Sequence, residues 1–120
     1  MNFGNWTSAG LILACVGSGE ALAESPRQFS GVASYYGTNY SGKTARGERY
    51  DPKKFTAAHR SLPFGTRLRV TNAGAQRSVI VVVNDRGPFA KGRVLDLSLA
   101  AAKALNMIDR GLIKVTAAIE

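Results

Sequence analysis

The chain has 120 residues, with 16 Lys and Arg against eight Asp and Glu, which gives a formal net charge of +8. This length suits one domain with one modest core. The basic residues are dispersed and do not interleave with the few aromatics, which argues against nucleic-acid binding and favours an anionic wall or envelope polymer as partner.

Residues 1–23 have the character of a secretory signal peptide. They contain no Lys or Arg, carry a short apolar run over residues 10–17, and end in Ala-Leu-Ala at residues 21–23, which suits signal peptidase. The run is too short for a bilayer span, which needs about 20 apolar residues. Because the segment lacks a basic start, a buried N-terminal helix is the alternative. We expect cleavage after Ala23 and export to the bacterial periplasm, cell envelope or exterior.

Cys15 is the only cysteine and lies inside this apolar run. The sequence Ile12-Leu-Ala-Cys15 is similar to a bacterial lipobox, in which the Cys is acylated after cleavage. A lipid anchor in the outer membrane and an ordinary apolar position of the signal peptide therefore stand as alternatives. Cleavage after Ala23 leaves 16 basic and seven acidic side chains, a formal charge of +9, and no disulfide to support the exported core.

Residues 24–30 are predicted to be a polar linker, and residues 31–120 the folded domain. Strands are predicted at residues 31–36, 66–71, 77–84, 92–97 and 113–119, with a return to the core at residues 55–59. The segment 37–49, rich in Gly, Ser, Thr, Asn and Lys, is predicted to be a long functional loop. Five or six strands with one helix predict a small β-barrel with Greek-key-like crossovers.

Two of these strands carry clear patterns. Residues 66–71 alternate, which places Leu68 and Val70 inward and Arg67, Arg69 and Thr71 outward. Residues 79–83 form a continuous β-branched run, which predicts a strand covered on both faces.

A short helix is predicted after residue 97. Ser98 is expected to cap it, and Leu99, Ala102 and Leu105 are expected to face inward over residues 99–105.

Asp85 is the most informative acid, because it stands where the buried strand breaks into the turn Arg86-Gly-Pro88. A carboxylate at such an edge is held by a stiff scaffold and can still face a cleft, which suits a general acid. The alternative is an Asx-type turn, in which Asp85 bonds to local backbone N–H groups.

Six ordered blocks resemble the rare lipoprotein A family, whose catalytic module is a double-psi β-barrel. They are Gly31-Val-Ala-Ser-Tyr-Tyr-Gly37, Thr44-Ala-Arg-Gly-Glu-Arg-Tyr-Asp51, Phe55-Thr-Ala-Ala-His-Arg-Ser-Leu-Pro63, Leu68-Arg-Val-Thr-Asn72, Val83-Asn-Asp-Arg-Gly-Pro-Phe89 and Gly92-Arg-Val-Leu-Asp-Leu-Ser98. The resemblance implies a mainly β fold, a six-stranded double-psi β-barrel with one or two short helices. It also implies an endolytic lytic transglycosylase that cleaves MurNAc–GlcNAc bonds of peptide-stripped peptidoglycan strands and leaves 1,6-anhydro-MurNAc ends.

The resemblance assigns catalytic roles to Asp85, Glu48, Asp51 and His59. Asp85 is expected to be the general acid and then the base toward the sugar 6-hydroxyl, and Glu48 the second carboxylate, although the two could exchange roles. Without the family, Glu48 would be taken as a solvated loop charge. Asp51 could orient a catalytic group or begin a turn. His59 could orient a carboxylate, bond the substrate or be a satisfied turn residue.

Substrate contacts are expected from Tyr35, Tyr36, Thr44, Tyr50 and Arg86. The tyrosines could stack on sugar rings or pack at the rim of the barrel. Arg86 could pair with Asp85, point at muramic-acid carboxylates or bond a neighbouring backbone. Asp96, which precedes the predicted helix, is interpreted as structural.

No cofactor and no metal are expected, because one His without a Cys cluster cannot form a metal site. We expect a monomer that binds glycan strands and no nucleic acid. Two alternatives are a non-catalytic, expansin-like glycan-binding module and a small basic protein that binds anionic envelope surfaces. The C-terminal peptidoglycan-binding repeat of some family members is not found in this sequence, and residues 40–43 differ from commoner versions, so septal recruitment and the contacts of this loop are left open.

Overall fold

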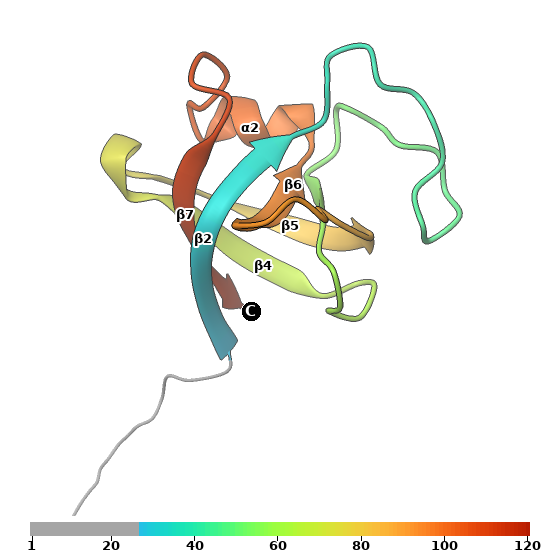
Figure 1. Cartoon of the computed structure of the whole chain (residues 1–120), viewed down its shortest axis with the longest axis horizontal. Coiled ribbons are helices and arrows are strands. Elements are labelled where there is room, and N and C mark those ends of the chain that lie inside the picture. The colour runs from blue at the N-terminus through green and yellow to red at the C-terminus, as the bar shows by residue number, and fades with distance from the viewer. Residues whose placement is uncertain (1–26) are drawn as a thin grey trace, which may run out of the picture.

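The computed structural model describes residues 27–120, so the predictions for the signal peptide and Cys15 lie outside the described residues. Six strands close into a barrel in the order β2-β6-β3-β5-β4-β7 (Figure 1). The strands are β2 (Gln28–Tyr35), β3 (Thr56–Ala58), β4 (Arg67–Asn72), β5 (Arg77–Asp85), β6 (Arg93–Leu97) and β7 (Ile113–Ile119). The described part also contains the short helix α2 (Leu99–Ala104) and the 3-10 turn η4 (Ala73–Ala75). The prediction of a mainly β, six-stranded barrel is confirmed.

The barrel mixes parallel and antiparallel pairs. Strand β2 runs parallel to β6, and β3 runs parallel to β5, whereas the other four pairs are antiparallel. Parallel neighbours need crossover connections. The long connection from β2 to β3 joins two strands that both pair with β6, and it carries the loop predicted to be functional, which Figure 1 shows extending beyond one end of the barrel.

The core follows the alternation of the strands. Leu68 and Val70 of β4 are fully buried, as predicted, while Arg67 and Arg69 are exposed. In β5, Val81 and Val83 are fully buried, but Ile80 and Val82 are only half-buried. The prediction that β5 is covered on both faces is therefore wrong. A small closed barrel has one interior, and its β-branched outer positions reflect strand propensity rather than a second covering layer.

Strand β2 begins three residues earlier than predicted, because its first residues pair with the last strand. Gln28, Phe29 and Ser30 lie opposite Ala118, Ala117 and Thr116 of β7. This pairing draws the end of the segment interpreted as a linker into the barrel.

Helix α2 starts as predicted, because the Ser98 hydroxyl oxygen accepts a hydrogen bond from the Ala101 N–H at 3.3 Å. Ala102 and Leu105 are buried as expected, but Leu99 is half-buried and Ala101 takes the inward position instead. The helix is too short for the pattern to fix which side of its first turn is covered. Within the described residues, none of the helices combines the length and apolar character needed to cross a bilayer.

Candidate active site

Asp85, the last residue of β5, is held by hydrogen bonds from three separate parts of the chain. Its Oδ1 accepts bonds from the backbone N–H groups of Ala45 at 2.7 Å and Arg86 at 2.8 Å, and its Oδ2 accepts a bond from the Tyr36 hydroxyl. Only the Arg86 contact is local, and it reaches one residue on rather than the two of an Asx-type turn. The other two donors come from the long β2–β3 connection, so the carboxylate is fixed between the barrel and this loop.

Tyr36 directs its hydroxyl to Asp85 from within a cluster of three tyrosines. Its ring stacks on Tyr50 with centroids 4.4 Å apart and packs against Tyr40 at 5.1 Å. Burial, followed by the hydrogen bond and the negative charge of Asp85, raises the pKa of Tyr36 far above its usual range. Tyr36 therefore remains a protonated donor to Asp85 at all physiological pH values.

Tyr50 is the buried member of this cluster. It is 5% exposed, and its hydroxyl oxygen accepts a hydrogen bond from the Leu99 N–H at 3.0 Å, at the start of α2. Burial raises its pKa as well. Tyr50 thus ties the tyrosine cluster to the helix, and its stacked face is not free for a sugar ring.

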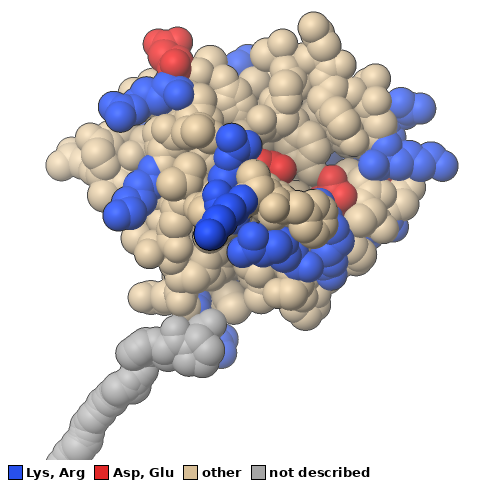
Figure 2. All heavy atoms as spheres, viewed as in Figure 1, with Lys and Arg blue, Asp and Glu red and all other residues tan. Residues whose placement is uncertain are grey.

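Glu48 lies next to the same end of β5. Its Oε2 accepts a hydrogen bond from Nδ2 of Asn84 at 3.4 Å, and its Oε1 lies 3.7 Å from Nε of Arg46. The Arg46 N–H bonds to the Asn84 carbonyl at 3.3 Å, which fastens the loop to the strand. The same loop therefore contacts both residues at the end of β5, since Ala45 bonds Asp85 and Glu48 bonds Asn84. Figure 2 shows that, on the face turned to the viewer, acidic side chains are fewer than basic ones.

Thr44 acts within the loop. It is buried, and both its N–H and its hydroxyl donate to the carbonyl oxygen of Glu48, at 2.8 and 3.2 Å. The side chain expected to bind substrate therefore closes the turn that presents Glu48.

His59 does not bond either carboxylate with its side chain. Its Nδ1 accepts hydrogen bonds from the N–H groups of Ser61 and Leu62, both at 3.1 Å. Burial, with smaller effects from Arg60 and Arg86, lowers the pKa of His59 below its usual value. The imidazole is accordingly neutral and shapes the turn after β3, while its backbone N–H bonds the Asp85 carbonyl at 3.1 Å.

Asp51 and Tyr35 also make their hydrogen bonds with partners other than the two predicted carboxylates. Asp51 accepts a hydrogen bond from the Lys53 N–H at 2.9 Å, which forms an Asx-type turn. Tyr35 packs against the core and donates its hydroxyl hydrogen to the Ile108 carbonyl at 2.7 Å. Because successive strand residues face opposite sides, Tyr36 reaches Asp85 and Tyr35 cannot.

Arg86 bonds the backbone rather than Asp85. Its guanidinium donates to the carbonyl oxygens of Leu62 at 2.8 Å and His59 at 3.2 Å and lies 4.0 Å above the ring of Phe64. This side chain anchors the turn that follows Asp85 to the loop after β3.

Asp96 joins the site although the sequence suggested a structural role. In strand β3, Ala58 pairs with Asp85 of β5 on one side and with Asp96 of β6 on the other. The Ser34 hydroxyl donates to Oδ1 of Asp96, and the charge of Asp96 helps to raise the pKa of Tyr36. Asp96 lies between the buried residues Leu95 and Leu97, so strand alternation places its side chain on the outer face of β6. The order of the strands was needed to place it near Asp85.

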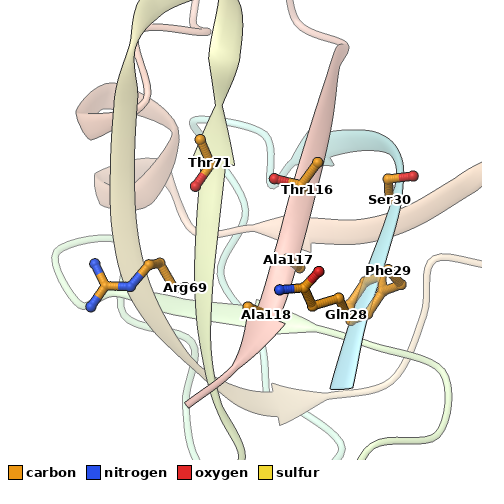
Figure 3. A pocket seen from close by; sticks show the side chains of 8 residues that line it. All are labelled: Gln28, Phe29, Ser30, Arg69, Thr71, Thr116, Ala117 and Ala118. Atoms are coloured by element: carbon orange, nitrogen blue, oxygen red, sulfur yellow. The ribbon is translucent and has the colours of Figure 1, made fainter. Parts of the chain in front are cut away.

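A pronounced groove lies elsewhere. It has a volume of about 580 Å³ and runs along the outer face of β7, between β2 and β4 (Figure 3). Its lining is Gln28, Phe29, Ser30, Arg69, Thr71, Thr116, Ala117 and Ala118, none of which was predicted to be catalytic. The candidate site is thus defined by its bonding pattern rather than by an enclosed cavity. Among residues 27–120, no three His, Cys, Asp or Glu side chains are grouped as metal ligands.

This arrangement suits acid–base chemistry on a polymer. A firmly held carboxylate, two further carboxylates nearby and an open surface fit proton transfer to and from a sugar chain. The extra negative charges would also stabilise an oxocarbenium-like transition state.

Comparison with known sequences matches the part of the chain that forms the barrel. The profile of the family described as lytic transglycolase matches residues 28–117. A protein of Nostoc sp. named probable endolytic peptidoglycan transglycosylase RlpA is 55% identical over 100 residues, which cover 80% of this chain and 27% of that protein. The endolytic peptidoglycan transglycosylase RlpA of Haemophilus influenzae is 52% identical over 83 residues, 68% of this chain and 29% of that protein. The chain therefore spans less than a third of the length of these two relatives.

Two solved structures share the architecture. The Streptomyces papain inhibitor superposes with a TM-score of 0.64 at 24% identity, over 78% of this chain and 94% of that one. The expansin of Clavibacter michiganensis superposes with a TM-score of 0.60 at 25% identity, over 78% of this chain and 50% of that one. The inhibitor supports the barrel fold alone, because its sequence is so distant.

Proposed function

The chain belongs to the lytic transglycolase family, and we propose on this premise that it is an endolytic peptidoglycan transglycosylase. Its substrate is the peptidoglycan glycan strand, cleaved between MurNAc and GlcNAc with formation of a 1,6-anhydro-MurNAc end. We further propose that residues 1–23 direct the protein to the cell envelope, with Cys15 as a candidate lipid anchor.

The bonding of Asp85 is the observation that carries this proposal. A carboxylate has about four lone-pair positions, two on each oxygen. The Ala45 and Arg86 N–H groups occupy both positions on Oδ1, and the Tyr36 hydroxyl occupies one on Oδ2. The remaining position on Oδ2 is therefore the place where a catalytic proton can be carried.

The reaction follows from that proton position. Asp85, protonated on Oδ2, gives its proton to the glycosidic oxygen as the bond from this oxygen to C1 of MurNAc breaks. The carboxylate then takes the proton of the MurNAc 6-hydroxyl as this oxygen bonds to C1 and closes the anhydro ring. Glu48 and Asp96 stabilise the positive charge that develops at C1 in between.

The charge of the protein supports the choice of strand. Removal of stem peptides leaves a free carboxylate on each muramic acid, and a chain with a net charge of +8 attracts such a polyanion. We therefore propose that peptide-stripped strands are preferred over strands that carry peptides.

The test uses purified protein and purified peptide-free glycan strands. Mass spectrometry should reveal shorter strands with anhydro-MurNAc ends, and strands that stay intact would contradict the proposal.

The likeness to an expansin favours a second candidate, a module that binds glycan without cleaving it. Binding of the same strands without any new ends would support that module over the enzyme.

A further inference from the structure

Phe89 is unusually exposed for an aromatic residue so near the site. Its side chain is 78% exposed, the most of any large hydrophobic residue within the described range. It lies four positions after Asp85, in the turn that leaves β5. Water contact with so much apolar surface is unfavourable, so a partner that covers the ring would gain free energy.

The turn that carries Phe89 is fixed at two points. The Arg86 guanidinium bonds the Leu62 carbonyl at 2.8 Å, and the Arg60 guanidinium bonds the Pro88 carbonyl at 3.5 Å. The Phe89 ring also rests against Gly87, since a Cβ added at Gly87 would lie 3.5 Å from Cε2 of the ring. Because hydrogen bonds already fix the backbone of this turn, binding to the exposed ring costs less conformational entropy.

Asp96 borders the same point. The Cβ added at Gly87 would lie 3.9 Å from Oδ2 of Asp96, so glycine leaves open a small space between the ring and this carboxylate. The Ser34 hydroxyl occupies Oδ1, whereas Oδ2 accepts no hydrogen bond from any residue in the described range. A ring and a free acceptor therefore meet beside Asp85.

A sugar ring can bind to both of these groups at once. The C–H face of a pyranose packs on an aromatic ring, and its hydroxyl groups donate hydrogen bonds to carboxylate oxygens. We propose that Phe89 and Oδ2 of Asp96 form a sugar subsite over Gly87, which holds one ring of the glycan strand next to Asp85. This inference rests on the proposed function, because it takes the glycan strand as the ligand.

Binding is measured without cleavage, in the Asp85→Asn background, by calorimetric titration with peptide-free glycan strands. Adding Phe89→Ala should weaken binding about tenfold, because the variant loses the contact between one aromatic ring and the sugar. Adding Phe89→Trp should restore binding, because the ring is kept. Adding Asp96→Ala should weaken binding as well.

Leu112→Ala is the matched control, because Leu112 is 45% exposed and lines a different groove with Asn106 and Arg110. It should leave affinity unchanged. Equal affinity of the Phe89→Ala and parent proteins, or equal losses with Phe89→Ala and Leu112→Ala, would overturn the subsite. Absence of anhydro ends with the wild-type protein, together with a loss of binding specific to Phe89→Ala, would reject the enzyme and keep the subsite.

Discussion

Replacement of Asp85 by Asn tests the bonding pattern and the chemistry together. The Asn carbonyl oxygen can keep both N–H donors, from Ala45 and Arg86, while the Asn amide faces the Tyr36 hydroxyl, which can rotate to accept. The variant should therefore fold. It should lose the activity by about 10²- to 10⁴-fold, the usual contribution of a general acid–base group.

The stability cost can be worked out from the same contacts. A hydrogen bond to a charged acceptor contributes about 1.5–3 kcal/mol and a neutral one about 0.5–1.5 kcal/mol. Loss of the charge at two N–H bonds would cost about 2 kcal/mol if both were buried. The Ala45 contact is exposed to water, so we expect about 1 kcal/mol. For a domain of this size, that lowers the melting temperature by about 4–8 °C.

Asp85→Ala and Tyr36→Phe are the comparisons. Asp85→Ala leaves two N–H groups without an acceptor and should be less stable than Asp85→Asn, whereas Tyr36→Phe removes only the donor to Oδ2 and should keep part of the activity. The assays are thermal denaturation and mass spectrometry of anhydro ends. Wild-type activity in Asp85→Asn, or equal stability of all three variants and the wild type, would refute the reasoning.

Three further variants test an ion pair, a pKa and the core. Glu48→Gln should reduce the release of anhydro ends at least tenfold, and its stability should stay within about 0.5 kcal/mol of wild type in denaturant unfolding, because its ion pair with Arg46 is exposed. The lowered pKa of His59 means that the unfolded chain binds more protons below pH 6.5, so stability should fall as the pH drops below this value. His59→Asn keeps the acceptor and should remove that pH dependence when unfolding is compared at about pH 5 and about pH 7.5. Leu68→Ala removes a fully buried side chain and should cost about 2–5 kcal/mol in the same unfolding assay, and a cost below about 1 kcal/mol would contradict its place in the core.

Features with a local sequence pattern could be predicted from the sequence alone. Alternation in β4 identified Leu68 and Val70 as core residues, and the break after β5 located Asp85 at a strand end. The family motifs brought Glu48 to the same region, and the contact between Glu48 and Asn84 agrees with that placement.

Features that depend on strand pairing were not readable from one sequence. Nothing in the residues around Ala58 indicates that it lies between two acids, because its partners are 27 and 38 positions away along the chain. The sequence also treated Tyr35 and Tyr36 alike, although the register of β2 sends one to the core and the other to Asp85. His59 and Arg86 were ambiguous because their backbone partners are set by the shape of the loop after β3.

The pairing of the first described strand with the last has a consequence for how this domain can be connected to other polypeptides. Gln28 lies opposite Ala118. A polypeptide segment joined before β2 and one joined after β7 would therefore start from neighbouring points of the barrel (Figure 1). Tyr36 follows the far end of the eight-residue β2, about 25 Å away at ~3.3 Å per residue. Attachments at either terminus would therefore begin at the end of β2 opposite to the one that Tyr36 follows.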